Sequence, residues 1–229
     1  MTQEIIIISL KSRFGSVNCY LIKAETGYFL IDTGWPNQRT ALEKELARLG
    51  CQPGNLMLIL ATHGDFDHTG NSAYLHEKYR TKIAMHRGDS AIVEQGDMFI
   101  NRKINNISRG ILRIGTIFLG LSKFDKFKPE IYLEDGKDLA EFGLEAKVLH
   151  VPGHSKGSIA FLTPFSHPSG AAGQALFCGD LLVNSSKPGK NSLVDDPAAL
   201  DDSVERLKEL KSITIYPGHG KPFPIELLR

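Results

Sequence analysis

Short runs of apolar residues alternate with amphipathic stretches along most of the chain, a pattern typical of an α/β protein. In the first third, the apolar runs predict three strands in a meander and two further strands, at 4–10, 17–23, 27–32, 55–62 and 81–86. Between them the pattern predicts two helices, over 39–50 and 72–80. Towards the C-terminus it predicts four more strands, at 144–151, 158–163, 175–180 and 212–217. It also predicts one helix there, over 201–211.

Two of these segments carry clear signals. Over 39–50, Leu42, Leu46 and Leu49 fall on one helical face, and Gly50 provides a C-terminal stop. The run at 55–62 is apolar almost throughout, which is typical of a strand with both faces covered. We therefore expect it to be a buried central strand.

Residues 87–130 break this rhythm, because basic and apolar positions mix there without a β period. We expect a helical insertion that is peripheral to the main sheet. Its basic residues are spread among apolar ones, which fits an amphipathic element, and they are Arg102, Lys103, Arg109 and Arg113. This insertion could form a lid over a site, a dimer contact or an ordinary helix packed on the core, and the sequence leaves all three open.

Composition narrows the class of protein. At roughly 150 residues per domain, 229 residues leave one or two domains, and with no linker or repeat we expect a single domain over 1–229. Hydrophobic residues at 41% and charged residues at 23% are ordinary globular values, which argues against disorder. Lys and Arg number 27 against 26 acidic residues, so no overall positive field favours nucleic acid or an anionic membrane as a partner.

The cysteines and the N-terminus bear on the cellular compartment. Cys19, Cys51 and Cys178 are odd in number and lack C-x-x-C spacing, which argues against a disulfide framework and a thiolate zinc site. Glu4 stands where a signal peptide has positive charge, and no run approaches the ~18 apolar residues of a membrane span. These features predict a cytoplasmic protein. Cys178 is expected to be a small buried residue rather than a nucleophile.

Potential metal ligands are concentrated directly after the central strand. The segment His63-Gly64-Asp65-Phe66-Asp67-His68 contains four of them within six residues. We expect a loop whose alternate side chains fan to two sides, so that His63 and Asp65 serve one metal while Asp67 and His68 serve another. Gly64 would permit the tight backbone that this requires.

Three more segments run from a predicted strand into a loop that carries a potential ligand. They are VPGHSKGS with His154, FCGD with Asp180 and YPGHGKP with His219. Loops at strand ends are where α/β folds gather functional groups, so the segments can converge. A glycine precedes each ligand, which suggests close backbone packing around something small, and these glycines are Gly153, Gly179 and Gly218.

The arrangement resembles the metallo-β-lactamase fold superfamily of metallohydrolases. The segments NCYLI, FLIDTG, THGDFDH, PGHSKGS, CGD and PGHGKP follow the family's order and cover most of the chain. The resemblance implies a four-layer αββα sandwich with two mixed sheets and the metals at the edge where the sheets meet. It also implies two metal ions, one held by His63, Asp65 and His154, the other by Asp67, His68 and His219, with Asp180 bridging them.

One position departs from the family's commonest pattern, His-x-His-x-Asp-His. Asp65 occupies the place of the second histidine. In having a carboxylate at this position the chain resembles the flavodiiron branch of the family, which has a glutamate there. Carboxylates suit iron or manganese better than imidazole does. We therefore expect two divalent ions, with zinc first and iron or manganese as alternatives.

The chemistry implied by such a site is the activation of water. A metal ion lowers the pKa of bound water from about 15.7 to roughly 7, which yields hydroxide near neutral pH. We expect a metal-bound hydroxide to cleave an ester-like bond, with lactones and thioesters ahead of phosphodiesters, and Asp67 to accept or pass the proton as the catalytic residue. The alternatives are a non-haem diiron redox protein and a metal-stabilised binding module without turnover.

Other polar residues are given more ordinary roles. His76, His86, His150 and His167 are expected to be surface or hydrogen-bonded histidines, and His150 is the one among them that could support the ligands. Asp32 either caps the turn that follows it or supports the metal loop. Ser185, Lys187 and Lys190 are expected in a solvated loop, with contact to an anionic substrate as the alternative.

The length of the chain after the last ligand bears on substrate and partners. Only ten residues follow His219, so we expect neither the C-terminal substrate domain of glyoxalase-II-like thioesterases nor the flavodoxin domain of flavodiiron proteins. The expected partner is a small-molecule substrate, and a homodimer is left open.

Overall fold

The first of two mixed sheets gathers the N-terminal half of the chain. The structure, a computed structural model, describes residues 3–12, 15–100, 110–111, 114, 125–166, 172–210 and 212–228. Within these residues the first sheet has the order β1-β2-β3-β4-β5-β6, formed by Glu4–Ser12, Gly15–Ala24, Gly27–Ile31, Leu56–Leu60, Lys82–Met85 and Ile131–Tyr132. The first three strands are antiparallel neighbours and the others pair in parallel, so both the predicted meander and the predicted central strand are confirmed.

The second sheet gathers the C-terminal half. Its described strands have the order β13-β12-β9-β8-β7, formed by Phe223–Pro224, Ile213–Pro217, Ala172–Gly179, Ile159–Ser166 and Lys147–His150. β8 is antiparallel to both β7 and β9, and β12 is parallel to β9. The carboxyl ends of β7, β9 and β12 therefore lie at one edge of the sheet. A small ribbon, β10 (Leu182–Val183) with β11 (Gly189–Lys190), follows β9.

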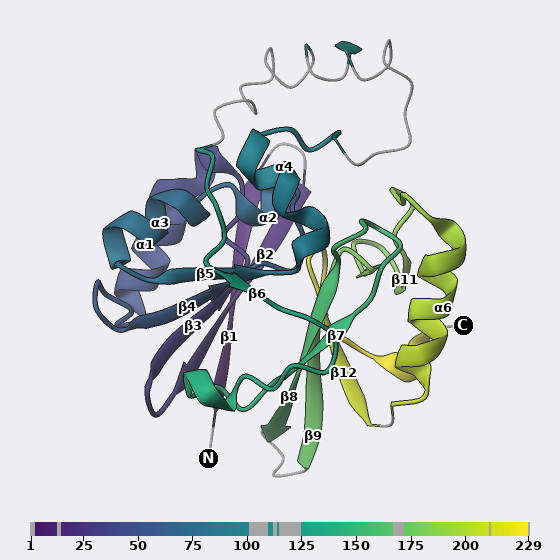
Figure 1. Cartoon of the computed structure of the whole chain (residues 1–229). Coiled ribbons are helices and arrows are strands. Elements are labelled where there is room, and N and C mark those ends of the chain that lie inside the picture. Colours follow the sequence, from purple (N-terminus) through teal and green to yellow (C-terminus); the bar gives the residue numbers. More distant parts are fainter. Residues whose placement is uncertain are drawn as a thin grey trace.

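Helices cover the outer face of each sheet (Figure 1). α1 (Arg39–Arg48) and α3 (Ser72–Tyr79) pack on the first sheet, and α6 (Pro197–Lys208) packs on the second. The expected four-layer αββα sandwich is confirmed. Shorter helical turns complete the described elements: α2 (Phe66–Thr69), α4 (Ser90–Gln95), η1 (Pro36–Gln38), η2 (Arg87–Asp89), η3 (Ala140–Phe142) and η4 (Ile225–Leu227).

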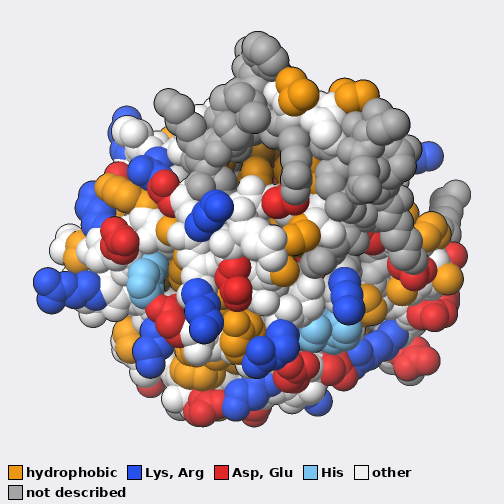
Figure 2. All heavy atoms as spheres, turned by 45° about the horizontal axis from the view of Figure 1, so that its top comes forward, with side chains coloured by type: hydrophobic (Ala, Val, Ile, Leu, Met, Phe, Trp, Pro, Cys, Tyr) orange, Lys and Arg blue, Asp and Glu red, His pale blue; other side chains and the backbone are white. Residues whose placement is uncertain are grey.

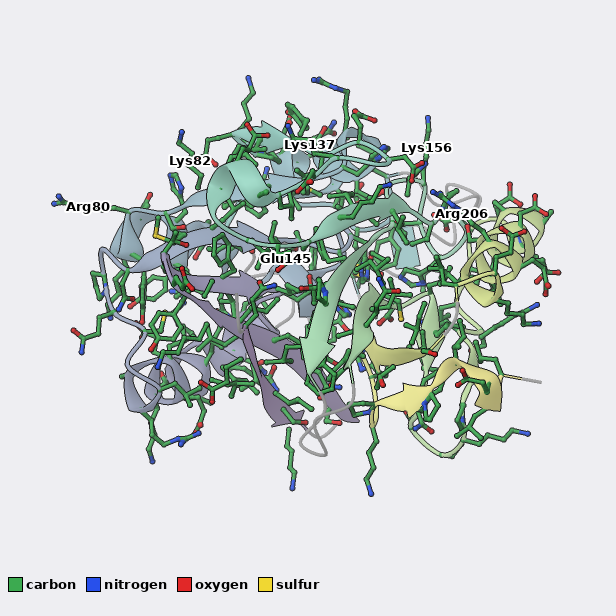
Figure 3. All side chains as sticks on the ribbon, turned by 90° about the horizontal axis from the view of Figure 1, so that it is seen from below. Arg80, Lys82, Lys137, Glu145, Lys156 and Arg206 are labelled. Carbon is green, nitrogen blue, oxygen red and sulfur yellow. The ribbon has the colours of Figure 1, made fainter. Side chains whose placement is uncertain are left out.

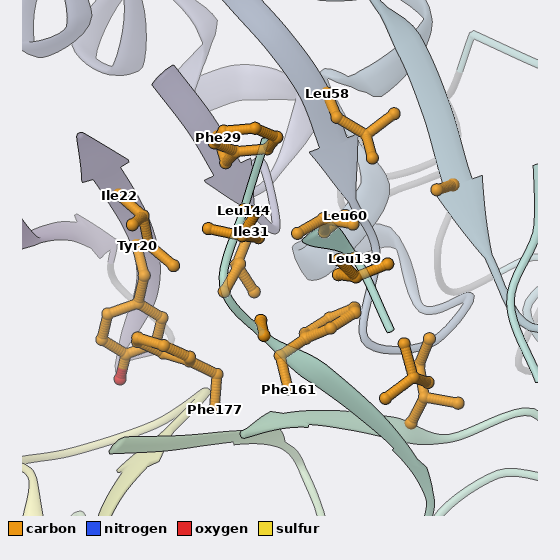
Figure 4. Close-up of a cluster of buried hydrophobic side chains, with 14 of the residues drawn as sticks. Tyr20, Ile22, Phe29, Ile31, Leu58, Leu60, Leu139, Leu144, Phe161 and Phe177 are labelled. Atoms are coloured by element: carbon orange, nitrogen blue, oxygen red, sulfur yellow. The ribbon is translucent and has the colours of Figure 1, made fainter. Parts of the chain in front are cut away.

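The main core lies between the two sheets (Figure 4). Tyr20 of β2 meets Phe177 of β9 across this core, with ring centroids 4.9 Å apart. The neighbouring Leu21 points to the opposite face of β2, where it packs with Leu42 and Leu46 of α1. Because both faces of such strands are buried, their sequences are continuously apolar. This burial is the physical reason that apolar runs marked the strands.

The start of α6 differs from the predicted helix over 201–211. The side chain of Asp196 accepts a hydrogen bond from the backbone N–H of Ala199, and Pro197 occupies the first helical position. These residues form a good N-terminus because the cap satisfies a free N–H group and proline has none to lose. The helix therefore begins four residues earlier, at Pro197.

The expectation that 87–130 is peripheral is wrong for both ends of that range. Asp89 is 0% exposed, and Ile92 and Val93 of α4 are buried in a small core with Phe66. At the other end, the backbone N–H of Glu130 bonds to the first sheet just before β6 continues it. The first end packs because α4 is amphipathic and its apolar residues Ile92 and Val93 need a buried face. The basic residues at 102, 103, 109 and 113 lie outside the described residues.

Charged side chains of both signs cover the surface. Acidic and basic groups are interspersed over the described part of the face in Figure 2. From below, Arg80, Lys82, Lys137 and Lys156 point outward (Figure 3). Among the residues that the structure describes, no helix combines the length and the hydrophobicity that crossing a membrane requires.

Candidate metal centre

The seven predicted ligands converge on one edge of the sandwich. His63, Asp65, Asp67 and His68 follow β4 of the first sheet. The other three come from the second sheet, where His154 follows β7, Asp180 follows β9 and His219 follows β12. Because these three strands run in the same direction, their ligands emerge at the same edge.

The segment after β4 is not the extended loop that we expected. Phe66–Thr69 forms one turn of helix, α2, with Asp65 at its N-cap position. The backbone carbonyl of Asp65 accepts hydrogen bonds from the N–H groups of His68 and Thr69. Asp67 and His68 are therefore presented by a helical turn, which explains how adjacent residues can face one site.

A first group of ligand atoms forms around His63 and His154. Ligand atoms of His63, His154 and Asp180 all lie within 4.8 Å of one another. Oδ2 of Asp65 lies 3.2 Å from Nε2 of His154 and 3.8 Å from Nε2 of His63. The structure thus places both carboxylates beside this pair of imidazoles.

A second group forms beside it. Ligand atoms of Asp67, His68 and His219 also lie within 4.8 Å of one another. Oδ1 of Asp180 lies 3.2 Å from Nε2 of His68 and 3.5 Å from Nε2 of His219. Asp180 therefore belongs to both groups, which is the position that a bridging carboxylate needs.

Each of the four imidazoles is fixed from behind through its Nδ1 atom. The partners of Nδ1 are the Thr62 hydroxyl for His63 at 3.0 Å, the Asp32 carboxylate for His68 at 2.8 Å, the Leu193 carbonyl for His154 at 2.6 Å and the Ser16 carbonyl for His219 at 2.7 Å. A carbonyl can only accept, so in His154 and His219 the proton is on Nδ1. Their Nε2 atoms then direct a lone pair inward whenever the ring is neutral.

These inward atoms meet other acceptors. Nε2 of His154 faces Oδ2 of Asp65 at 3.2 Å, and Nε2 of His219 faces Oδ2 of Asp67 at the same distance. The buried atoms that have no hydrogen-bond partner among the described residues include Nε2 of His63, Nε2 of His68 and Oδ1 of Asp180. Opposed lone pairs require a proton or a cation between them. Nitrogen and carboxylate donors in this arrangement fit divalent metal ions.

Without metal, protons have to lie between the opposed atoms, and the pKa values of His68 and His219 reflect that. Burial lowers the pKa of His63 well below its usual value. Burial would also lower the pKa values of His68 and His219, but the carboxylates of Asp67 and Asp180 raise both, that of His219 to about 10. Burial would raise the pKa of Asp180, whereas the two histidines hold it well below its usual range.

Asp32 supports the ligands from beneath. Its Oδ2 atom contacts Nδ1 of His68 and accepts a hydrogen bond from the hydroxyl of Thr62, while its Oδ1 atom accepts one from the Thr62 backbone N–H, each at 2.8 Å. The residue has a φ of 59°, a left-handed conformation that aspartate tolerates better than most residues. The hydrogen bonds favour the supporting role over a simple turn cap.

Asp89 is a supporting residue that our sequence analysis missed. It accepts hydrogen bonds from the N–H of Gly64 at 2.9 Å, the N–H of Gly157 at 2.7 Å and the hydroxyl of Ser155 at 2.6 Å. It thereby ties the loop of His63 to the loop of His154. The signal that could have revealed it is the one used for the ligands, a polar residue shortly after a strand, but we had assigned it to the insertion.

The glycines before the ligands have two different functions. A Cβ atom at Gly179 would lie 2.5 Å from Oγ1 of Thr62, and one at Gly218 would lie 2.5 Å from Oδ1 of Asp180. Close packing at the site thus explains these two. A Cβ at Gly153 would instead lie 2.4 Å from Cα of Leu200, so this glycine permits contact with α6.

The remaining histidines lie outside the two groups. His86 and His150 stack on each other with ring centroids 4.2 Å apart, and Nε2 of His150 donates to the carbonyl of Lys156. His76 bonds through Nδ1 to the carbonyl of Thr81. His167 lies outside the described residues.

The cysteines and the loop after Asp180 have ordinary surroundings. All three cysteines are free and buried, and burial raises the pKa of Cys178 to about 12, which is unsuited to a nucleophile. Lys190 pairs with Asp201 of α6 at 2.6 Å, whereas Ser185 and Lys187 are exposed.

The αββα sandwich and the paired histidine and aspartate groups at its edge are features of a metal-dependent hydrolase. The chain belongs to the metallo-beta-lactamase superfamily, whose family model matches residues 12–219. It is accordingly a metal-dependent hydrolase.

Solved structures agree with this membership. TTHA1623, solved in a di-iron-bound form, is 30% identical, has a TM-score of 0.71, and is matched over 97% of this chain and 96% of that protein. The subclass B3 metallo-beta-lactamase BJP-1 of Bradyrhizobium japonicum is 20% identical with a TM-score of 0.70, over 95% of this chain and 77% of that protein. The second likeness shows the shared fold.

Curated relatives include the probable metallo-hydrolase YqjP of Bacillus subtilis, which is 25% identical over 96% of this chain and 73% of that protein. The hydroxyacylglutathione hydrolase of Francisella philomiragia is 38% identical over 95 residues, 41% of this chain and 34% of that protein. The chain thus aligns with about a third of the length of this second relative.

Proposed function

We propose that this protein is a binuclear hydrolase that cleaves an ester-like bond, with thioesters and lactones ahead of phosphodiesters. The observation that carries the proposal is the position of Asp180, whose carboxylate belongs to both groups of ligand atoms. Similarity to a hydroxyacylglutathione hydrolase supports an acyl substrate, and a thioester in particular.

Two divalent ions are the proposed cofactor. His63, Asp65 and His154 would hold one, Asp67, His68 and His219 would hold the other, and Asp180 would contact both. When bound, such ions make water acidic enough to ionise near neutral pH and polarise the bond under attack. Zinc is the first choice, while Asp65 and the di-iron form of TTHA1623 keep iron or manganese as alternatives.

Asp67 is proposed as the catalytic residue that handles the proton. Its side chain is 14% exposed, compared with 8% for Asp65 and 10% for Asp180, and its neighbour His219 is 25% exposed. Substrate therefore approaches the site from the side of Asp67 and His219. We assign to the Asp67 carboxylate the role of taking a proton from the attacking water and returning it to the leaving group.

The test combines metal quantification with a panel of thioesters, lactones, phosphodiesters and β-lactams. The variant Asp180→Asn should lose at least one metal equivalent and nearly all turnover. Asp201→Asn serves as the matched control because Asp201 is exposed and pairs only with Lys190 in the contacts described. Full activity and full metal content in Asp180→Asn would overturn the proposal.

A second candidate is a non-haem diiron redox protein, favoured by the carboxylate of Asp65 and by the di-iron-bound relative. Metal analysis and the visible spectrum of anaerobically purified protein separate the two. A colourless zinc protein without a redox response excludes the diiron redox function. Ester hydrolysis well above that of Asp180→Asn would also exclude a binding module without turnover.

A further inference from the structure

One side chain outside the seven ligands is joined to two of them. Nδ2 of Asn191 donates a hydrogen bond to Oδ2 of Asp180 at 3.0 Å. Oδ1 of the same amide accepts one from the backbone N–H of Leu193 at 3.0 Å. The carbonyl of Leu193 in turn accepts the Nδ1 proton of His154 at 2.6 Å. A continuous chain of hydrogen bonds thus runs from Asp180 through Asn191 to His154.

The first branch of this chain orients the shared carboxylate. The two oxygens of Asp180 are chemically equivalent, but Asn191 contacts Oδ2 while Oδ1 faces His68 and His219. A donor on Oδ2 restricts rotation of the carboxylate and keeps Oδ1 directed at the second group. Because an amide is neutral, it does so without changing the charge of the site.

The second branch orients His154. The Leu193 side chain is 73% exposed, so packing of that side chain does not hold the segment in place. Its backbone is held by hydrogen bonds on both sides, to Asn191 through the N–H and to His154 through the carbonyl. Asn191 itself is anchored to the strand end by its backbone N–H, which bonds to the carbonyl of Leu181.

We propose that Asn191 is a positioning residue that sets Asp180 and His154 together, so that the two metal ions bind in one fixed arrangement. The role rests on the proposed function, because it presumes that these two residues are metal ligands. Groups that orient metal ligands in this way typically contribute 10–100-fold to metal affinity.

Two variants separate the branches. Asn191→Ala removes both hydrogen bonds of the side chain. Asn191→Asp keeps the size and the acceptor for the Leu193 N–H, but it replaces the donor to Asp180 with a second carboxylate. Two controls leave the chain of hydrogen bonds intact: Leu193→Ala, because only backbone atoms of Leu193 take part, and Ser192→Asp, which adds the same charge at the exposed neighbouring residue.

The measurements are made on the full chain, first freed of metal and then titrated with Co²⁺. Affinity is obtained by competition with a chelating indicator, and the geometry of the site from the visible absorption of bound Co²⁺. We expect Asn191→Ala to bind about 10–100-fold more weakly with an altered spectrum. Asn191→Asp should show an altered spectrum, and both controls should match the wild type. The melting temperature of the metal-free proteins shows that each variant is folded.

Affinities within twofold of the wild type and unchanged spectra in both Asn191 variants would overturn the role of Asn191 alone. If Asn191→Ala does not fold, the spectrum of Asn191→Asp decides. A wild-type protein that binds no Co²⁺ would overturn the proposed metal centre, and the role of Asn191 with it.

Discussion

Oδ2 of Asp32 lies 2.8 Å from Nδ1 of His68, and the two residues are 2% and 0% exposed. The same oxygen accepts a hydrogen bond from the hydroxyl of Thr62, which lies 3.0 Å from Nδ1 of His63. One buried carboxylate therefore fixes an imidazole of the second group directly and one of the first group through Thr62. Asp32 therefore links the orientations of the two groups, although it reaches their imidazoles from behind and not at the Nε2 atoms that face the site.

Replacing Asp32 with asparagine should weaken metal binding while keeping the fold. Asparagine tolerates the left-handed backbone conformation at this position. Its amide NH₂, however, would face a group that now donates a hydrogen bond to the carboxylate, so one of these bonds is lost. We expect metal affinity to fall about 10–100-fold. Chelator competition measures this, with Asp138→Asn as a control because Asp138 is exposed and its carboxylate accepts a hydrogen bond from the N–H of Ala140. Unchanged affinity would contradict the supporting role.

Removing the carboxylate of Asp89 should destabilise the protein. Asp89→Ala leaves the buried N–H groups of Gly64 and Gly157 without an acceptor, and each such loss costs about 1–3 kcal/mol. The expected fall in the free energy of unfolding is therefore about 2–6 kcal/mol, measured by urea unfolding. Ser155→Ala removes only one of the three donors and should cost about 0.5–1.5 kcal/mol. Equal losses in the two variants would contradict this account.

The sequence predicted the sheets well because their strands are buried on both sides. The run 55–62 contains β4 at Leu56–Leu60, and the runs near the C-terminus contain most of β7, β9 and β12. The two-residue strands β6 and β13 are too short to show any alternation. Their pairing depends on neighbours in the sheet rather than on their own residues.

The sequence also predicted which ligand segments meet, because each follows a strand and carries at least one potential metal ligand. It missed Asp89 and Asn191 for the same physical reason. Their partners are single backbone or side-chain groups in loops, such as Gly157 for Asp89, which is 68 residues away, and Asp180 for Asn191, which is 11 residues away. A lone aspartate or asparagine carries no periodic signal, and the place of Asp89 shortly after a strand does not say which groups it contacts. Only the folded structure reveals these contacts.

The stability of the metal-free protein should fall as the pH rises. The pKa of His219 is raised from 6.5 to about 10 in the folded protein. Because the folded state holds this proton more tightly than the unfolded state, the resulting stabilisation is complete below about pH 6.5 and is lost by about pH 10. The raised pKa of His68 acts in the same direction.

Urea unfolding in the presence of a chelator, at about pH 7 and about pH 9, measures this loss. The control is His219→Gln, which cannot take up the proton and should show a smaller difference between the two pH values. If the free energy of unfolding falls by the same amount between the two pH values in the wild type and in His219→Gln, His219 is not the source of the pH dependence.

Adding a single methyl group at Gly218 should displace the ligands. A Cβ atom there would lie 2.5 Å from Oδ1 of Asp180 and 2.6 Å from Cε1 of His68, closer than real Cβ atoms approach other atoms. Gly218→Ala should therefore lose at least one metal equivalent and about 1–3 kcal/mol of stability, as overpacked sites do. Gly189→Ala is the matched control, because a Cβ there meets nothing within 4 Å. Metal analysis and thermal unfolding of both variants test this, and full metal content in Gly218→Ala would show that the two ligands can move aside without losing the ions.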